Sequence, residues 1–205
     1  MPRPTPSART KARRIRRLLA VGLTAVTAAI ATACGSPQQK PPAAGFPAAS
    51  SPPSASEADG VVPDGVTVLD DELPAVARLH PDLLDALRQA ATAAADDDVT
   101  FYVNSGWRSP AYQERLLREA VSRYGSEDEA VRWVATADTS PHVSGDAVDL
   151  GPSDATDWLS EHGAEYGLCQ IYRNEPWHYE LRPEAIDDGC PTMYADPTED
   201  PRMRQ

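Results

Sequence analysis

The sequence predicts an α+β domain in which helices pack on one side of a small antiparallel sheet. Two observations support this fold class. Segments with apolar residues at helical spacing come first in the folded region, and short β-prone runs fall between the helices and end in a hairpin-like pair. This order of elements favours two packed layers around a single core.

The first long helix is predicted to follow His80. Pro81 suits the first helical position, where its missing N–H would have no partner in any case, and Asp82 suits the positive end of the helix dipole. An apolar stripe with the spacing of one helix face follows, at Leu83, Leu84, Leu87, Ala91 and Ala94.

Two further helices are marked by their ends. Ser109 and Pro110 start one helix, and Gly125 ends it. Ser126 and Glu129 form the pattern of a capping box, which predicts a short helix that continues to about residue 134.

A fourth helix is predicted to begin at Ser153 or Asp154 and to end at Gly163. Trp158 in this helix and Trp133 in the preceding one stand at the spacing of core positions. We therefore interpret both tryptophans as packing residues.

Strands are predicted at 99–103, 147–150, 168–172 and 177–181. Successive side chains of a strand point to opposite faces of the sheet. In the last run Trp177, Tyr179 and Leu181 share one face, which leaves His178 and Glu180 on the other.

The first 33 residues have the pattern of a secretory signal. A basic region from Arg3 to Arg17 precedes an apolar run from Leu18 to Ala33. The run is short for a membrane span. Small residues directly before Cys34 are typical of a bacterial lipoprotein signal, so we expect Cys34 to become the lipidated N-terminus; ordinary cleavage nearby is the alternative. The protein is then exported and anchored at the outer face of the cytoplasmic membrane.

Residues 34–58 are predicted to be a flexible linker, because proline, serine and alanine dominate them and large apolar residues are almost absent. Residues 59–205 have the length of one domain with one core. We expect this domain to be catalytic and monomeric.

The exported part of the chain is strongly acidic. The first 33 residues hold seven of the nineteen basic residues and none of the thirty-one acidic ones. Such a charge argues against nucleic acid as a partner and against contact with anionic membranes other than through the lipid anchor.

Cys169 and Cys190 are the remaining cysteines. In an exported protein an isolated pair favours a disulfide, which here would hold the chain on both sides of residues 177–178. Zinc ligation is the competing interpretation, but no second cysteine stands at ligand spacing from either one.

Two short motifs carry candidate metal ligands. His142 and Asp149 lie seven residues apart with Gly145 between them, and glycine permits the close backbone approach that two ligands of one metal need. Such a pair is also common in ordinary loops. Glu175 and His178 add a second histidine and a carboxylate that can lie beside it without binding the metal. Two histidines and one aspartate would leave one tetrahedral position open, as in catalytic zinc sites.

Three polar residues are candidates for binding substrate. Arg108 follows the first predicted strand and could bind a terminal carboxylate in a bidentate manner, although a surface ion pair is the usual role of such an arginine. Gln113 lies about one helical turn further on and could face the same cleft. Ser140 could orient His142 or the substrate, and a role in a cap or turn is equally consistent with its position.

Together these motifs resemble the VanY-type zinc D-alanyl-D-alanine carboxypeptidases, which are related to the VanX dipeptidases and share a fold with the hedgehog signalling domain. The resemblance covers roughly residues 70–181. It rests on Ser-Gly-Trp-Arg-Ser at 105–109, Ser-x-His-x-x-Gly-x-Ala-x-Asp at 140–149 and Glu-x-Trp-His at 175–178. Trp107 stands where the family often has tyrosine, and we expect it to line the cleft.

The resemblance implies one Zn²⁺ ion and a general base, Glu175. It also implies that Arg108 and Ser140 act on the substrate, a stem peptide of peptidoglycan that loses its terminal D-alanine. The implied zinc ligands are His142, Asp149 and His178.

Two alternatives remain open from the sequence. An L,D-carboxypeptidase or a peptidoglycan endopeptidase would use the same zinc set on a different bond. A peptidoglycan-binding lipoprotein without turnover would keep the zinc but would have no need of Glu175.

Overall fold

The structure is a computed structural model that describes residues 54–204. The predicted signal segment, Cys34 and all but the last residues of the predicted linker lie outside the described residues.

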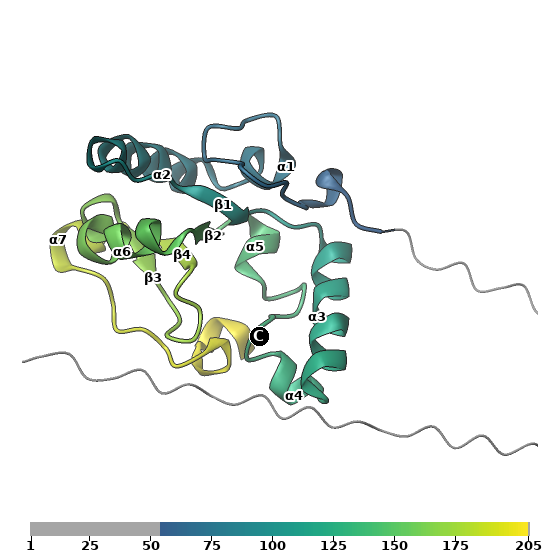
Figure 1. Cartoon of the computed structure of the whole chain (residues 1–205). Helices are drawn as coiled ribbons and strands as arrows, with labels where there is room; N and C mark the ends of the chain where they lie inside the picture. The colour runs from purple at the N-terminus through teal and green to yellow at the C-terminus, as the bar shows by residue number, and fades with distance from the viewer. Residues whose placement is uncertain (1–53, 205) are drawn as a thin grey trace, which may run out of the picture. The chain divides into compact units, whose positions relative to one another are not determined.

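In Figure 1 the longer helices α2 and α3 lie at two edges of the described part of the chain, and shorter helices lie between or beside them. The α-helices are α1 (Pro74–Ala77), α2 (Pro81–Ala94), α3 (Pro110–Tyr124), α4 (Glu127–Ala130), α5 (Pro141–Ser144), α6 (Ser153–His162) and α7 (Ala185–Asp188). Turns of 3₁₀ helix are η1 (Glu57–Asp59), η2 (Ala95–Asp97), η3 (Gly163–Tyr166), η4 (Pro197–Glu199) and η5 (Pro201–Arg204).

The sheet has the order β1-β2-β4-β3, and all neighbouring strands are antiparallel. This confirms the predicted small antiparallel sheet and the α+β class. The strands are β1 (Tyr102–Ser105), β2 (Ala147–Gly151), β3 (Leu168–Gln170) and β4 (His178–Leu181).

The two faces of the sheet have different uses. Val148 and Tyr179 are cross-strand partners, and both belong to the main hydrophobic core, to which α2 and α6 also contribute. The neighbouring positions in each strand point the other way. On that second face lie Asp149, His178 and Glu180, all of them buried polar residues. The sheet therefore separates a hydrophobic core from a polar site.

Helices α2 and α4 begin where the sequence predicts. The backbone N–H of Glu129 donates to Ser126 Oγ, which is one half of the predicted capping box. The backbone N–H of Asp82 donates to His80 Nδ1, a cap that was not predicted. Helix α4 ends at Ala130, earlier than predicted.

Strand β1 begins at Tyr102, three residues later than expected from the β-prone run. Helix α6 ends before Gly163, as predicted. Gly163 is not a left-handed cap, however, because its backbone is helical and it begins η3. A side chain at Gly163 would lie 2.5 Å from the carbonyl oxygen of Leu168, so close packing explains the glycine.

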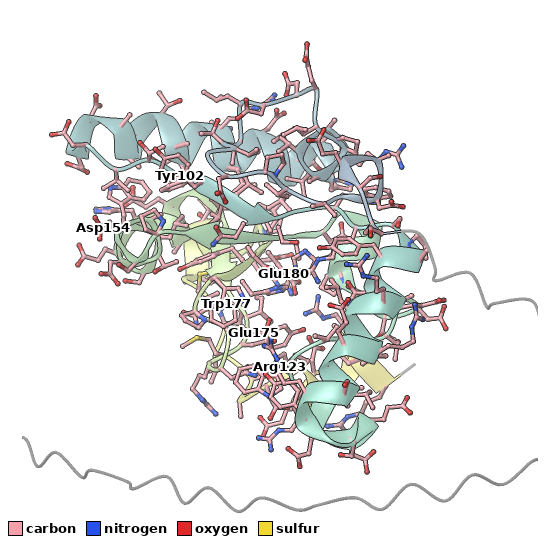
Figure 2. The ribbon with its side chains drawn as sticks, turned by 45° about the vertical axis from the view of Figure 1, so that its right-hand side comes forward. Tyr102, Arg123, Asp154, Glu175, Trp177 and Glu180 are labelled. Carbon is pink, nitrogen blue, oxygen red and sulfur yellow. A yellow bond between two sulfur atoms is a disulfide. The ribbon has the colours of Figure 1, made fainter. Side chains whose placement is uncertain are left out.

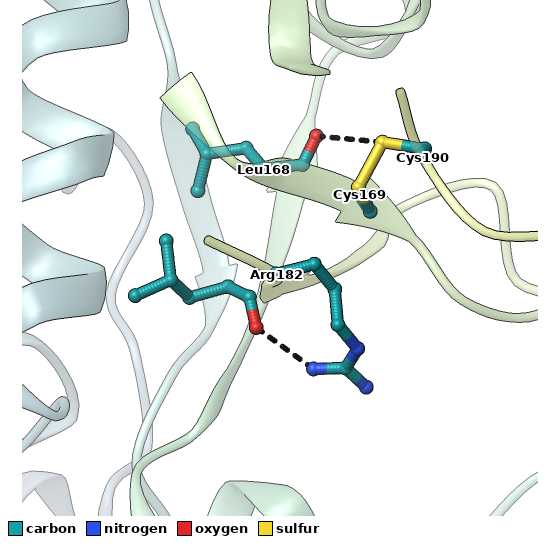
Figure 3. Close-up of a disulfide and its surroundings, with 5 residues drawn as sticks. Leu168, Cys169, Arg182 and Cys190 are labelled. Atoms are coloured by element: carbon teal, nitrogen blue, oxygen red, sulfur yellow. Dashed lines mark hydrogen bonds between the residues drawn. A yellow bond between two sulfur atoms is a disulfide. The ribbon is translucent and has the colours of Figure 1, made fainter. Parts of the chain in front are cut away.

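The predicted disulfide between Cys169 and Cys190 is present (Figure 3). It joins β3 to the segment that follows α7, and Cys169 is fully buried. The bond thus fixes the chain on both sides of β4, which carries His178.

Within residues 54–204, none of the helices combines the length and the apolar character that crossing a bilayer requires.

Candidate active site and metal centre

Two candidate metal ligands face each other across the sheet. Asp149 on β2 is the cross-strand partner of His178 on β4, and His178 Nδ1 lies 3.3 Å from Asp149 Oδ1. His142 Nε2 lies 3.3 Å from the same oxygen. Ligand atoms of all three residues lie within 4.8 Å of one another, and all three side chains are buried. The structure therefore brings together the three candidate ligands named from the sequence.

Contacts with the backbone orient the His142 side chain toward Asp149. Its Nδ1 lies 2.8 Å from the carbonyl oxygen of Gly106, which leaves Nε2 free to face Asp149. The helical turn that carries His142 ends at Gly145 with a φ of 84°. A Cβ atom at Gly145 would also lie 2.4 Å from the carbonyl oxygen of Arg78, so two independent constraints require glycine between the two ligands.

The electrostatics of the three ligands are coupled. Burial alone would raise the pKa of Asp149, but the imidazoles of His142 and His178 and the Arg108 guanidinium outweigh it and lower the pKa. Burial and the positive charge of Arg108 lower the pKa of His142, which favours the neutral imidazole that binds metals. For His178, hydrogen bonds with Asp149 and Glu180 outweigh burial and raise the pKa to about 9.

Glu175 lies beside the three candidate ligands but is not one of them. It precedes β4 on a loop, and its Oε2 lies 3.8 Å from His178 Nδ1. Its Oε1 is buried and has no hydrogen-bond partner among the described residues. Burial is the main reason that the pKa of Glu175 rises to about 7. A carboxylate in this state can accept a proton at neutral pH and return it.

Arg108 is held in the site by three contacts. Its Nε donates to Ser105 Oγ at 2.8 Å, one Nη donates to Gln113 Oε1 at 3.1 Å, and the other donates to Asp149 Oδ2 at 2.9 Å. Gln113 is buried and is itself fixed by donating to the carbonyl oxygen of Ala135. The structure thus places Gln113 beside Arg108, where it orients the guanidinium.

These residues line a cleft of about 300 Å³. Ser140 lies on its wall; it is 5% exposed, and its Oγ has no hydrogen-bond partner among the described residues. Ser140 is the N-cap residue of α5, but its side chain does not cap that helix. Its hydroxyl is therefore available to a molecule in the cleft.

Several residues line the cleft although the sequence did not predict them there. Trp133 does not pack in the core as predicted; it is 39% exposed and stacks on Tyr124 with ring centroids 5.9 Å apart. Both rings line the cleft, together with Arg123. Arg123 and Glu175, both labelled in Figure 2, line the same cleft. The early end of α4 explains the error, since Trp133 lies beyond the helix whose periodicity suggested burial.

Trp107 is also placed differently from the expectation. Its ring lies under the Arg78 guanidinium, with Cζ 4.3 Å from the ring centroid, and it is not among the residues that line the cleft. By contrast, Trp177 lines the cleft next to Glu175 (Figure 2).

The donor set fits a zinc ion. Imidazole nitrogens and carboxylate oxygens are common ligands of Zn²⁺, and three protein ligands leave one coordination position open. The unpartnered Glu175 Oε1 and Ser140 Oγ face the same cleft. Such a buried donor set with a free carboxylate beside it is typical of hydrolases that use a catalytic metal.

Comparison with known proteins also points to a hydrolase. The family model of VanY, D-alanyl-D-alanine carboxypeptidase, matches residues 76–184, which is more than half of the chain. The chain therefore belongs to the VanY family of D-alanyl-D-alanine carboxypeptidases.

One curated relative and two solved structures illustrate the similarity. A D-alanyl-D-alanine carboxypeptidase of Enterococcus faecalis is 31% identical over 127 residues, which cover 50% of this chain and 46% of the relative. The chain thus matches about half the length of that protein.

The structure of VanYB in complex with D-alanine-D-alanine is 26% identical, with a TM-score of 0.50 and coverage of 54% of this chain and 74% of VanYB. The LdcB LD-carboxypeptidase is 23% identical, with a TM-score of 0.50 and coverage of 62% and 70%, and shares the fold.

Proposed function

We propose that this protein is a zinc-dependent D,D-carboxypeptidase that removes the terminal D-alanine from stem peptides of peptidoglycan. The observation that carries the proposal is the buried group of His142, Asp149 and His178 with Glu175 Oε1 left free beside it. Membership of the VanY family and the D-alanine-D-alanine bound by the similar VanYB support the choice of substrate.

His142, Asp149 and His178 would hold the ion. Zn²⁺ bound by such residues polarises a carbonyl group and lowers the pKa of water to about 7. The remaining chemistry belongs to side chains of this protein.

Glu175 is placed to move the proton. Its Oε1 accepts a proton from the attacking water and later delivers it to the nitrogen of the departing D-alanine as the peptide C–N bond breaks. The pKa of about 7 that burial gives Glu175 suits both halves of this transfer. The hydrolysis consumes one water and releases one free amino acid.

Arg108 and Ser140 are placed to hold the substrate. The Arg108 guanidinium can donate to the terminal carboxylate or to the oxyanion that develops at the carbonyl, and the free Ser140 hydroxyl offers a further hydrogen bond. Gln113 keeps the guanidinium in position through its Oε1.

The test is incubation of the zinc-loaded protein with defined stem peptides, with products identified by mass. Loss of one alanine from the pentapeptide is the expected result. Loss of alanine from the tetrapeptide would instead indicate an L,D-carboxypeptidase, and cleavage of cross-linked dimers an endopeptidase. Absence of any product would contradict catalysis and favour a binding protein.

We also propose that the protein works outside the cytoplasm on a lipid anchor at Cys34. The disulfide supports export, because such bonds persist in oxidising compartments. A Cys34→Ala variant should be released from membranes into the soluble fraction; membrane retention of that variant would contradict the anchor.

A further inference from the structure

The last part of the described chain contributes to the cleft although it lies beyond the family match, which ends at residue 184. We call residues 191–204 the C-terminal segment. Its Pro197 and Met203 line the same cleft as Glu175. In Figure 1 this segment, drawn in yellow, lies near α4.

An ion pair fastens the segment to the sheet. Arg202 donates to both carboxylate oxygens of Glu180 on β4, at 2.7 and 3.2 Å, and its Nε also donates to Asp200. The Glu180 side chain is fully buried. A buried carboxylate needs paired positive charge, and Arg182 supplies a third hydrogen bond to Glu180 at 2.7 Å.

Glu180 is in turn a partner of a metal ligand. Its Oε1 lies 3.2 Å from Nε2 of His178, while the other ring nitrogen, Nδ1, faces Asp149. A carboxylate on the far nitrogen of a ligand histidine fixes both the tautomer and the orientation of the ring. Arg202 therefore acts on the metal centre through Glu180.

Two more contacts hold the segment around the site. The Tyr172 hydroxyl donates to Asp200 at 3.0 Å, and the Tyr172 ring lies 5.1 Å from the ring of His178. Arg132, the residue before the cleft residue Trp133, donates to Asp196 at 2.9 Å. The segment is thus fixed both to Tyr172 and to the chain that follows α4.

We propose that the C-terminal segment is a working part of the active site. Arg202 is a positioning residue that fixes His178 through Glu180, and Pro197 and Met203 form a wall that contacts the bound peptide. The second statement rests on the proposed function, because it needs the stem peptide as occupant of the cleft.

The positioning role is tested by zinc affinity, measured by competition with a chromophoric chelator. Arg202→Met should bind zinc about 10- to 100-fold more weakly than the unchanged protein, which is the usual effect of losing a partner of a ligand. Arg202→Lys, which keeps the charge, should recover part of the loss.

Arg204→Met is the matched control. Arg204 lies on the same turn, but among residues 54–204 its side chain donates to the carbonyl oxygens of Thr198 and Glu199 and not to Glu180. This variant should keep its zinc affinity. If folded Arg202→Met binds zinc as tightly as Arg204→Met, the segment is a structural clamp only, and the proposal is wrong.

Glu180→Gln covers the case in which Arg202→Met does not fold. It preserves the volume and an acceptor oxygen but removes the charge, and it should also weaken zinc binding. Unchanged zinc affinity in Glu180→Gln would overturn the positioning role.

Met203→Ala tests the wall. The KM for the stem peptide should rise several-fold while zinc affinity stays constant. An unchanged KM would overturn the proposal that Pro197 and Met203 contact the bound peptide. If no peptide is cleaved by the unchanged protein yet Arg202→Met loses zinc affinity, the proposed function fails and the positioning role stands.

Discussion

Asp149 and His178 are directly opposite residues of β2 and β4, so the register of the sheet alone brings together two candidate metal ligands that are 29 residues apart in the chain. Their ligand atoms lie 3.3 Å apart. A shift of one residue in either strand would turn one of them into the hydrophobic core. The apolar partners on the other face, Val148 and Tyr179, therefore also protect the geometry of the metal centre.

His142→Ala should abolish tight zinc binding, because it removes one of three protein ligands. Bound zinc per protein, measured after dialysis against a weak chelator, checks this. His162→Ala is the control, since His162 lies on α6 with its side chain 40% exposed, pairs with Glu161 and Glu165 and lies outside the candidate metal site. Full retention of zinc by His142→Ala would contradict the ligand assignment.

Glu175→Gln should keep its zinc but lose hydrolysis. The amide has almost the same shape as the carboxylate but cannot accept the proton, so kcat should fall by about 10²- to 10⁴-fold. Zinc content and stem-peptide turnover are measured on the same sample.

The matched control for this change is Glu161→Gln, an exposed carboxylate on α6. Turnover by Glu175→Gln comparable to that of the control would show that another group moves the proton.

Arg108→Lys should be much less active although it keeps the positive charge. Lysine cannot donate at once to Ser105, Gln113 and Asp149, nor bind a carboxylate in a bidentate manner. We expect kcat/KM to fall about 100-fold. Arg118→Lys on the exposed side of α3 is the control, and equal activities of the two variants would exclude the proposed role of Arg108.

Much of the site could be predicted from the sequence because its residues stand in compact motifs. The alternation of strand residues put His178 on the face opposite Tyr179, and Gly145 between His142 and Asp149 suggested close backbone approach. Local rules of this kind hold wherever neighbouring residues decide the conformation.

The rest depends on contacts between distant segments. Arg202 meets Glu180 across 22 residues of sequence, and no local pattern marks either as a partner of the other. Trp133 has the spacing of a core residue, yet the end of α4 at Ala130 leaves it in the cleft. Tertiary packing decides such positions, and a single sequence carries no signal for it.

Replacing both Cys169 and Cys190 with serine should destabilise the domain. The disulfide closes a loop of 21 residues, and its loss should reduce the free energy of unfolding by about 3 kcal/mol. Urea denaturation of the double variant and of the unchanged protein measures the difference. Addition of a reductant should lower the stability of the unchanged protein to that of the variant and leave the variant unaffected; equal stability of the two oxidised proteins would contradict the prediction.

Asp200→Asn should destabilise the domain at neutral pH but not in acid. Burial alone would raise the pKa of Asp200, but hydrogen bonds from Arg202 and Tyr172 outweigh it and lower the pKa below the ordinary value. A carboxyl group with a lowered pKa stabilises the folded state fully above its unfolded pKa of about 3.9, and this contribution is lost as the pH falls through the folded pKa. The asparagine variant should therefore be less stable by about 2 kcal/mol at pH 7. The difference should shrink once the pH falls below about 4. Urea denaturation over this pH range measures it, with Asp187→Asn on α7 as control. A difference that stays constant into acid would mean that the contacts of Asp200 do not depend on its charge.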